Sequence, residues 1–82
     1  MSGRPYRPID CGLHDILLDR ATRRVVEAIR HRAPDGGVAT TTDRIVDVYT
    51  ADGAEYLRTA GGVVVRLDEL LGVGAVEFPA AD

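Results

Sequence analysis

The chain has 82 residues, of which 45% are hydrophobic, 28% are charged and only 5% are aromatic. A chain of this length folds as one domain around a single modest hydrophobic core. No apolar run approaches the roughly 20 residues that cross a bilayer, and the composition is neither collagen-like nor of low complexity. We therefore expect one small globular domain over residues 1–82, with no membrane segment.

The charge is distributed unevenly along this chain. The net charge is −3 at pH 7; residues 1–33 hold seven arginines and four acidic residues, whereas residues 34–82 hold three arginines and nine acidic residues. Because affinity for nucleic acid depends on neutralised phosphates, an acidic chain is a poor partner for it. A basic protein surface is the more natural partner, so we do not expect direct binding to nucleic acid.

The cysteine content and the N-terminus bear on the compartment. A lone cysteine, Cys11, cannot form an internal disulfide, which is typical of a reducing environment. The first residues lack the apolar segment of a secretion signal. Ser2 occupies the position at which myristoylation requires glycine. These features predict a cytoplasmic protein.

The chain opens with an arm and a helix. Two prolines and the lack of apolar periodicity predict that residues 1–9 are extended. Asp10 is a good N-cap, and its carboxylate suits the positive end of a helix dipole. Apolar residues follow at helical spacing: Leu13, Ile16, Leu17 and Ala21. We predict a helix over 10–21.

The end of this helix is ambiguous. The apolar spacing continues and permits one helix as far as about Arg32. The β-branched pair Val25–Val26 instead favours a strand. Periodicity leaves both possibilities open, and we favour a break near Ala21–Thr22 followed by a strand over 23–32.

The remaining chain is predicted to form short strands separated by turns that contain glycine. The turn signals are Pro34–Gly37, Asp52–Gly53 and Gly61–Gly62. Between them we expect strands over 38–50, 54–60, 63–67 and 73–78, with a single helical turn over 68–71. The stretch 38–50 is longer than a usual strand, so we expect a sharp bend near Thr42–Asp43.

This pattern predicts a mainly β fold with an N-terminal α-helix. Five short strands, one of them long and bent, are typical of a small and strongly bent antiparallel barrel, here over 23–78. Closing the barrel would also remove the exposed edges that an open five-stranded sheet leaves.

The sequence lacks a complete set of the residues that usually mark a catalytic or metal site. Cys11 and His14 have one-turn spacing, but zinc needs two further ligands and the other histidine, His31, is distant in sequence. Cys11 at a helix N-terminus is either an activated thiol or, as we favour, a small residue packed beneath the helix. The glycine pairs match no phosphate-binding motif, and the chain is small for a catalytic pocket. We expect neither an enzyme nor a cofactor or metal site.

Three aspartates form the most distinctive charged feature. Asp15 and Asp19 lie on adjacent turns of one helix face, and Asp10 lies at the cap. They either complement the helix dipole or present an acidic ridge that docks on a surface lined by arginine and lysine, of the kind that normally holds nucleic acid.

The opening residues resemble a known family. Tyr6-Arg7-Pro8-Ile9-Asp10-Cys11, followed by His14-Asp15 and Leu17, resembles the motif Tyr-x-Pro-Ile-(Asn/Asp)-Cys-x-x-(Tyr/His)-Asp-x-Leu of the Rho-binding antiterminator family, known as Rof or YaeO. Residues 44–57 and 65–68 resemble strand segments of the same family. The likeness covers about residues 6–74.

The resemblance implies both a fold and a function. It implies a small Sm-like or SH3-like barrel preceded by a helix, and a protein that binds the transcription termination factor Rho at its RNA-binding surface and inhibits Rho-dependent termination. Such inhibition is competition, in which a compact acidic protein occupies basic grooves meant for single-stranded RNA. By position in the motif, Asp15 corresponds to the residue of the family that contacts Rho. Tyr6, Asp10 and His14 lie in or beside the same motif.

Two other functions are consistent with the sequence. One is an Sm-like module that binds RNA directly through its basic cluster, although the net charge argues against it: Arg20, Arg23, Arg24, Arg30 and Arg32. The other is a protein-interaction adaptor that has a partner other than Rho.

Overall fold

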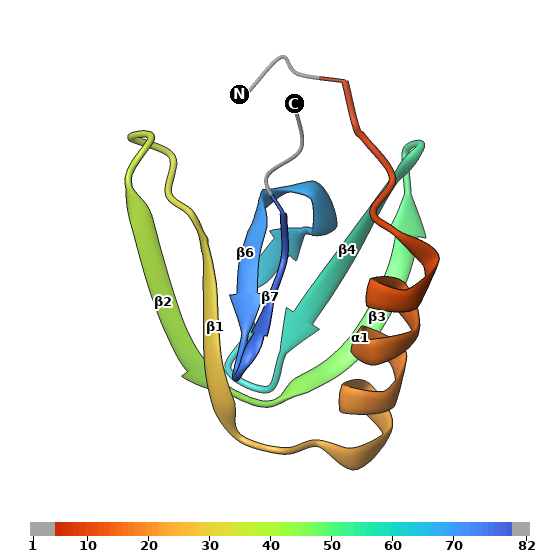
Figure 1. The fold of residues 1–82 in the computed structure, drawn as a ribbon, viewed down its shortest axis with the longest axis vertical. Helices are drawn as coiled ribbons and strands as arrows, with labels where there is room; N and C mark the ends of the chain where they lie inside the picture. Colours follow the sequence, from red (N-terminus) through yellow and green to blue (C-terminus); the bar gives the residue numbers. More distant parts are fainter. Residues whose placement is uncertain (1–4, 80–82) are drawn as a thin grey trace.

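The computed structural model describes residues 5–79. These residues form a mainly β domain with one N-terminal helix and two antiparallel sheets (Figure 1). Residues 1–4 of the predicted arm lie outside the described residues, as do residues 80–82. The elements, in chain order, are α1 (Cys11–Arg23), β1 (Glu27–Arg32), β2 (Val38–Asp43), β3 (Ile45–Ala51), β4 (Ala54–Thr59), β5 (Val64–Arg66), the 3₁₀ helix η1 (Leu67–Glu69), β6 (Leu70–Val73) and β7 (Val76–Glu77).

Helix α1 begins at the predicted cap. The Asp10 carboxylate accepts a hydrogen bond from the Gly12 N–H at 2.9 Å, which satisfies one of the donors that a helix start leaves free. Two positively charged side chains in the last turn, Arg20 and Arg23, suit the negative end of the helix dipole. The prediction of a capped helix here is confirmed.

The helix ends two residues later than predicted. It runs to Arg23, and Arg24 closes it in the left-handed conformation, with φ 55° and a hydrogen bond from its N–H to the Arg20 carbonyl at 2.7 Å. Strand β1 then begins at Glu27, so the predicted strand over 23–32 starts too early. The alternative of one helix as far as Arg32 is wrong, because the left-handed residue turns the chain out of the helix.

The predicted long strand over 38–50 is divided in two. Strand β2 lies in a sheet of order β2-β1-β6-β7, and β3 lies in a sheet of order β3-β4-β5. The change of sheet occurs at Arg44, next to the predicted bend. There the Asp43 carboxylate accepts hydrogen bonds from the N–H groups of Arg44, at 2.7 Å, and Gly61, at 2.8 Å. Asp43 therefore ties the bend to the turn between β4 and β5.

The hairpin between β3 and β4 forms where the sequence predicts it. Ala51 lies opposite Ala54, and the two turn residues between them, Asp52 and Gly53, both have positive φ, at 52° and 79°. This is the conformation that a two-residue hairpin turn requires. The rings of Tyr49 and Tyr56 stack across the pair, with their centroids 5.6 Å apart.

The C-terminal part differs most from the prediction. The expected single strand over 73–78 is replaced by a hairpin of two short strands, β6 and β7, and the helical turn lies at Leu67–Glu69. The described residues therefore contain seven strands rather than five, in two sheets rather than one closed barrel. The reason is η1, which carries the chain from β5 in one sheet to β6 in the other.

One hydrophobic core joins the two sheets and the helix. Its buried members are Leu17, Ile29, Ile45, Leu57, Val65, Leu67, Leu70, Val73 and Phe78. Helix α1 packs against β3 and contributes Leu17, which is completely buried. Because one face of α1 is held against the core, its opposite face is exposed. In residues 5–79, no helix has the length and apolar character that crossing a membrane requires.

Candidate functional site

The candidate site is the outward face at the start of α1. Leu17 is buried, and Asp15, two residues away, lies on the opposite side of the helix because each residue advances the helix by about 100°. Asp15 is exposed, and its side chain makes no hydrogen bond or ion pair with any other residue in the range 5–79. Its carboxylate is therefore available to a partner.

Asp10 contributes a second exposed carboxylate, at the helix cap. One of its oxygens, Oδ2, is engaged by the Gly12 N–H, but the group keeps its exposure to solvent. At this position the two roles considered for the acidic residues, helix capping and docking on a basic surface, are therefore compatible. Asp10 caps the helix and also adds negative charge beside the first turn.

Asp19 differs from the other two aspartates. It is held by ion pairs with Arg20 Nη1, at 3.2 Å, and Arg23 Nε, at 3.0 Å. These pairs lie on the surface, so each contributes little to stability. They nevertheless offset the charge of Asp19, and the acidic ridge predicted over three aspartates is reduced to Asp10 and Asp15.

The side chains of His14 and Tyr6 both contact Glu55 of β4, a residue that the sequence did not indicate. His14 Nε2 lies 2.8 Å from Glu55 Oε2, and the Tyr6 hydroxyl donates to Glu55 Oε1 at 2.8 Å. Tyr6 and Glu55 are 49 residues apart in the chain. No local pattern marks Glu55, because the contact depends on where the arm crosses β4. Both predicted residues therefore hold the arm and helix in place.

A shallow hollow brings part of the predicted motif together. It is lined by Pro8, Ile9, Cys11, His14, Asp15 and Glu55. Cys11 is exposed there, so our expectation that it packs beneath the helix is wrong: the residue of α1 that is fully buried is Leu17. Within residues 5–79, no three or more histidine, cysteine or acidic residues are grouped so that they could hold a metal ion.

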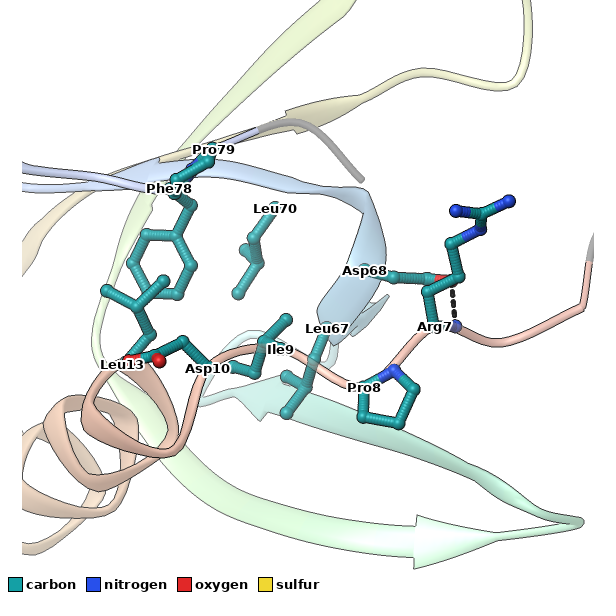
Figure 2. Close-up of a pocket in the computed structure, with 10 residues that line it drawn as sticks. All are labelled: Arg7, Pro8, Ile9, Asp10, Leu13, Leu67, Asp68, Leu70, Phe78 and Pro79. Atoms are coloured by element: carbon teal, nitrogen blue, oxygen red, sulfur yellow. Dashed lines mark hydrogen bonds between the residues drawn. The ribbon is translucent and has the colours of Figure 1, made fainter. Parts of the chain in front are cut away.

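A second, more enclosed cavity of about 170 Å³ is lined by residues of the arm, α1, η1 and the chain after β7 (Figure 2). Its wall is mostly apolar and includes Leu13 from α1, Leu67 from η1 and Phe78 after β7. Asp68 closes one end, with a side chain that is only 1% exposed. Its Oδ2 accepts a hydrogen bond from the Arg7 N–H at 3.1 Å, the dashed line in Figure 2. This contact fastens the arm to η1.

Arg66 completes the attachment of the arm. Its Nε donates to Asp68 Oδ1 at 2.6 Å, and its guanidinium lies 5.8 Å from the centre of the Tyr6 ring. The hydrogen bond to Asp68 raises the pKa of Arg66. Burial raises the pKa of the Tyr6 phenol far above its ordinary value, and the hydrogen bond to Glu55 and the charge of Glu55 add to this effect. Tyr6 therefore remains a donor to Glu55 at neutral pH.

The five arginines of the basic cluster, on which the alternative hypothesis of direct RNA binding depends, are mostly paired with carboxylates. Four of the five arginines have such a partner: Arg20–Glu27 at 2.9 Å, Arg23–Asp19 at 3.0 Å, Arg30–Glu77 at 2.8 Å and Arg32–Glu69 at 3.8 Å. Of the five, only Arg24 has no carboxylate partner among residues 5–79. The arginine cluster is therefore locally neutralised, whereas Asp15 is not.

No model of a known protein family matches this chain, and no curated protein sequence matches it.

Proposed function

We propose that this protein is a non-enzymatic, Rof-like adaptor that binds the transcription termination factor Rho and inhibits Rho-dependent termination. The contact surface is the start of α1 together with the adjoining arm. The observation that carries the proposal is the state of the Asp15 carboxylate, which is exposed and has no hydrogen-bond or ion-pair partner among residues 5–79. It is also the residue that corresponds in the family motif to the contact with Rho.

The proposed mechanism is competition for a basic groove. A surface that binds single-stranded RNA presents arginine and lysine side chains to phosphates. Carboxylates held at the start of a rigid helix offer the same charge in a fixed position, so little conformational freedom is lost on binding. Asp15 and Asp10 supply that charge. Glu55 lies beside Asp15 in the shallow hollow, and its bonds to Tyr6 and His14 fix the arm against the helix.

We also propose that the two sheets are the halves of an Sm-like barrel. A continuous stretch of chain passes through Arg44 from β2 in one sheet to β3 in the other, and residues of both sheets share one core. A termination regulator of this kind would act in the cytoplasm, which agrees with the lone cysteine.

The test is binding to purified Rho, measured by titration calorimetry with matched charge variants. Asp15→Arg is expected to weaken binding by about 1–3 kcal/mol, the effect of losing a charge-assisted contact at an interface. Asp15→Asn removes one negative charge and should weaken binding less. Glu77→Gln removes the same charge from β7, in the sheet that does not carry α1, and should leave binding unchanged.

Three results would contradict the proposal. The first is no binding to Rho by the unmodified protein. The second is equal binding by the unmodified protein and Asp15→Arg, which would remove Asp15 from the site. The third is binding to oligo-pyrimidine RNA with a steep salt dependence and no affinity for Rho, which would favour the RNA-binding module instead.

A further inference from the structure

Strand β2 is an unprotected sheet edge. Among residues 5–79 it pairs with β1 only, and Figure 1 shows it at the outer side of its sheet. Proteins usually protect such an edge with lysine, proline, a bulge or a covering element. Strand β2 has the sequence Val38-Ala39-Thr40-Thr41-Thr42-Asp43, which contains no lysine or proline. Its one charged residue is Asp43, at the end of the strand.

The other edges of the two sheets are shorter or covered. Strand β7 has two residues and β5 has three, whereas β2 has six. Strand β3 packs against α1. Strand β2 is therefore the longest edge in the described part of the chain that has nothing packed beside it.

The register shows which backbone groups are free on β2. The Ala33 N–H donates to the Gly37 carbonyl at 2.8 Å, so Ala33 and Gly37 are a hydrogen-bonded pair. In an antiparallel ladder these pairs alternate with pairs that are not hydrogen-bonded. Ala39, Thr41 and Asp43 therefore direct their N–H and C=O groups toward β1. An independent contact agrees with this register. The Ala28 carbonyl, opposite Thr42, accepts instead from the Gly74 N–H, at the end of β6.

The backbone groups of Val38, Thr40 and Thr42 consequently point outward, and their spacing is self-complementary. When Thr40 faces Thr40 of an antiparallel second copy, Val38 faces Thr42 of that copy at both ends. All three pairs then bring outward-pointing groups together, and each pair exchanges two hydrogen bonds. We propose that the protein forms a two-fold symmetric dimer through its β2 edges, which joins two sheets into one.

The side chains in this register also favour a second copy of the chain. Val38 is 67% exposed, the most exposed of the large hydrophobic residues in the structure, and it would lie beside Thr42 of the other copy. Thr40 would lie beside Thr40. Pairs of β-branched residues across antiparallel strands stabilise a sheet.

Charge complementarity supports the same register. Arg44 follows β2, and it would lie opposite Gly36 of the second copy, next to Asp35 in the same turn. Asp35 has no ion pair among residues 5–79, and Arg44 interacts electrostatically with the adjacent Asp43. Two-fold symmetry creates this Arg44–Asp35 approach twice, once at each end of the paired strands.

The dimer would leave the α1 surface free. Helix α1 lies at the opposite side of the molecule from β2 (Figure 1). A dimer therefore presents two copies of the Asp15 surface, pointing away from each other, and can act as a bivalent ligand. Pairing of one strand edge buries less area than a standard interface, so we expect a dissociation constant in the micromolar range or weaker.

Sedimentation equilibrium tests this proposal, over protein concentrations from about 1 µM to about 1 mM, a range that brackets such affinities. The unmodified protein is expected to pass from monomer to dimer. Thr40→Pro removes an outward N–H and no bond to β1, so it should remain folded and weaken dimerisation at least tenfold. Thr40→Val keeps that N–H and should dimerise like the unmodified protein. Circular dichroism and urea unfolding establish that both variants are folded.

Arg44→Glu provides a second test if Thr40→Pro does not fold. It places like charges together at both ends of the interface, so it should weaken the dimer, and added salt should reduce the difference. A protein that stays monomeric over the whole range would overturn the proposal, as would association that neither substitution changes. Asp15→Arg should dimerise normally, so failure of this proposal and failure of Rho binding are distinguishable.

Discussion

The Tyr6 hydroxyl donates a hydrogen bond to the Glu55 carboxylate at 2.8 Å, across 49 residues of sequence. The second oxygen of the same carboxylate lies 2.8 Å from His14 Nε2. One residue of β4 therefore positions both the arm and the first turns of α1. Because Asp15 adjoins His14, the presentation of the proposed Rho-binding carboxylate depends on this contact.

Tyr6→Phe tests this attachment of the arm. The substitution keeps the ring that lies beneath Arg66 and removes only the hydroxyl, so the hydrogen bond to Glu55 is lost. We expect the free energy of unfolding to fall by about 1 kcal/mol, the usual value of one hydrogen bond. Urea unfolding at neutral pH measures the change. Tyr49→Phe is the control, since this ring stacks on Tyr56 and its variant retains the stacking. An unchanged urea midpoint in Tyr6→Phe would show that the arm is held without this bond.

The same hydroxyl predicts a dependence of stability on alkaline pH. Burial raises the pKa of Tyr6, so the folded protein holds this proton more tightly than the unfolded chain, whose tyrosine has a pKa near 10. The stability that comes from this difference is complete below about pH 10 and is lost as the pH rises toward the folded-state pKa. The difference in unfolding free energy between the unmodified protein and Tyr6→Phe should therefore shrink above that pH. A difference that stays constant up to pH 12 would contradict the assignment.

We expect Asp68 to contribute more to the free energy of unfolding than the acidic residues of the surface do. Its side chain is 1% exposed, and it accepts hydrogen bonds from Arg66 and from the Arg7 backbone. Asp68→Ala should lower the unfolding free energy by about 3 kcal/mol, because it removes the main hydrogen-bond acceptor of a largely buried guanidinium, that of Arg66. Glu69→Ala is the control, because the Glu69 carboxylate lies 3.8 Å from the Arg66 guanidinium. This substitution should lower the unfolding free energy by less than about 1 kcal/mol. Equal losses in the two variants would place the attachment of the arm elsewhere.

The sequence predicted the elements that local chemistry determines. The cap at Asp10, the apolar stripe that buries Leu17 and the turn at Asp52–Gly53 are all present. The end of α1 was placed early because Arg24 takes the left-handed conformation that glycine usually occupies, and an arginine gives no signal of it. The change of sheet at η1 depends on contacts between distant strands, so no local pattern indicates it.

The candidate site was predictable to a similar extent. The position of Asp15 follows from that of Leu17, because a helix with a buried face exposes the opposite one. Asp19 was harder to judge, since the pairing of its carboxylate with Arg20 and Arg23 depends on side-chain conformation. Glu55 could not be predicted at all, because its role comes from the path of the arm over β4.

Asp43 should make the link between the sheets sensitive to acid. The N–H groups of Arg44 and Gly61 hold the pKa of its carboxyl below the ordinary value. For a lowered pKa, the contribution to stability is present above the unfolded-state pKa, near 4, and is lost as the pH falls through the folded-state value. Asp43→Asn should lower the urea midpoint at pH 7 and have a smaller effect at pH 3. Asp52→Asn, in a turn that asparagine suits equally well, should leave the midpoint unchanged at both pH values.

Adjacent leucines of α1 provide the sharpest test of how the helix is held. Leu17 is completely buried, whereas Leu18 is 43% exposed. Leu17→Ala should lower the unfolding free energy by about 2–5 kcal/mol, from lost burial and the cavity that remains. Leu18→Ala should change it by less than about 0.5 kcal/mol. Both variants have the same helix propensity, so the difference reports packing alone. Urea unfolding followed by circular dichroism measures it, and similar losses in both would mean that α1 does not bury the Leu17 face on β3. The exposure of Asp15 would then lose its structural basis.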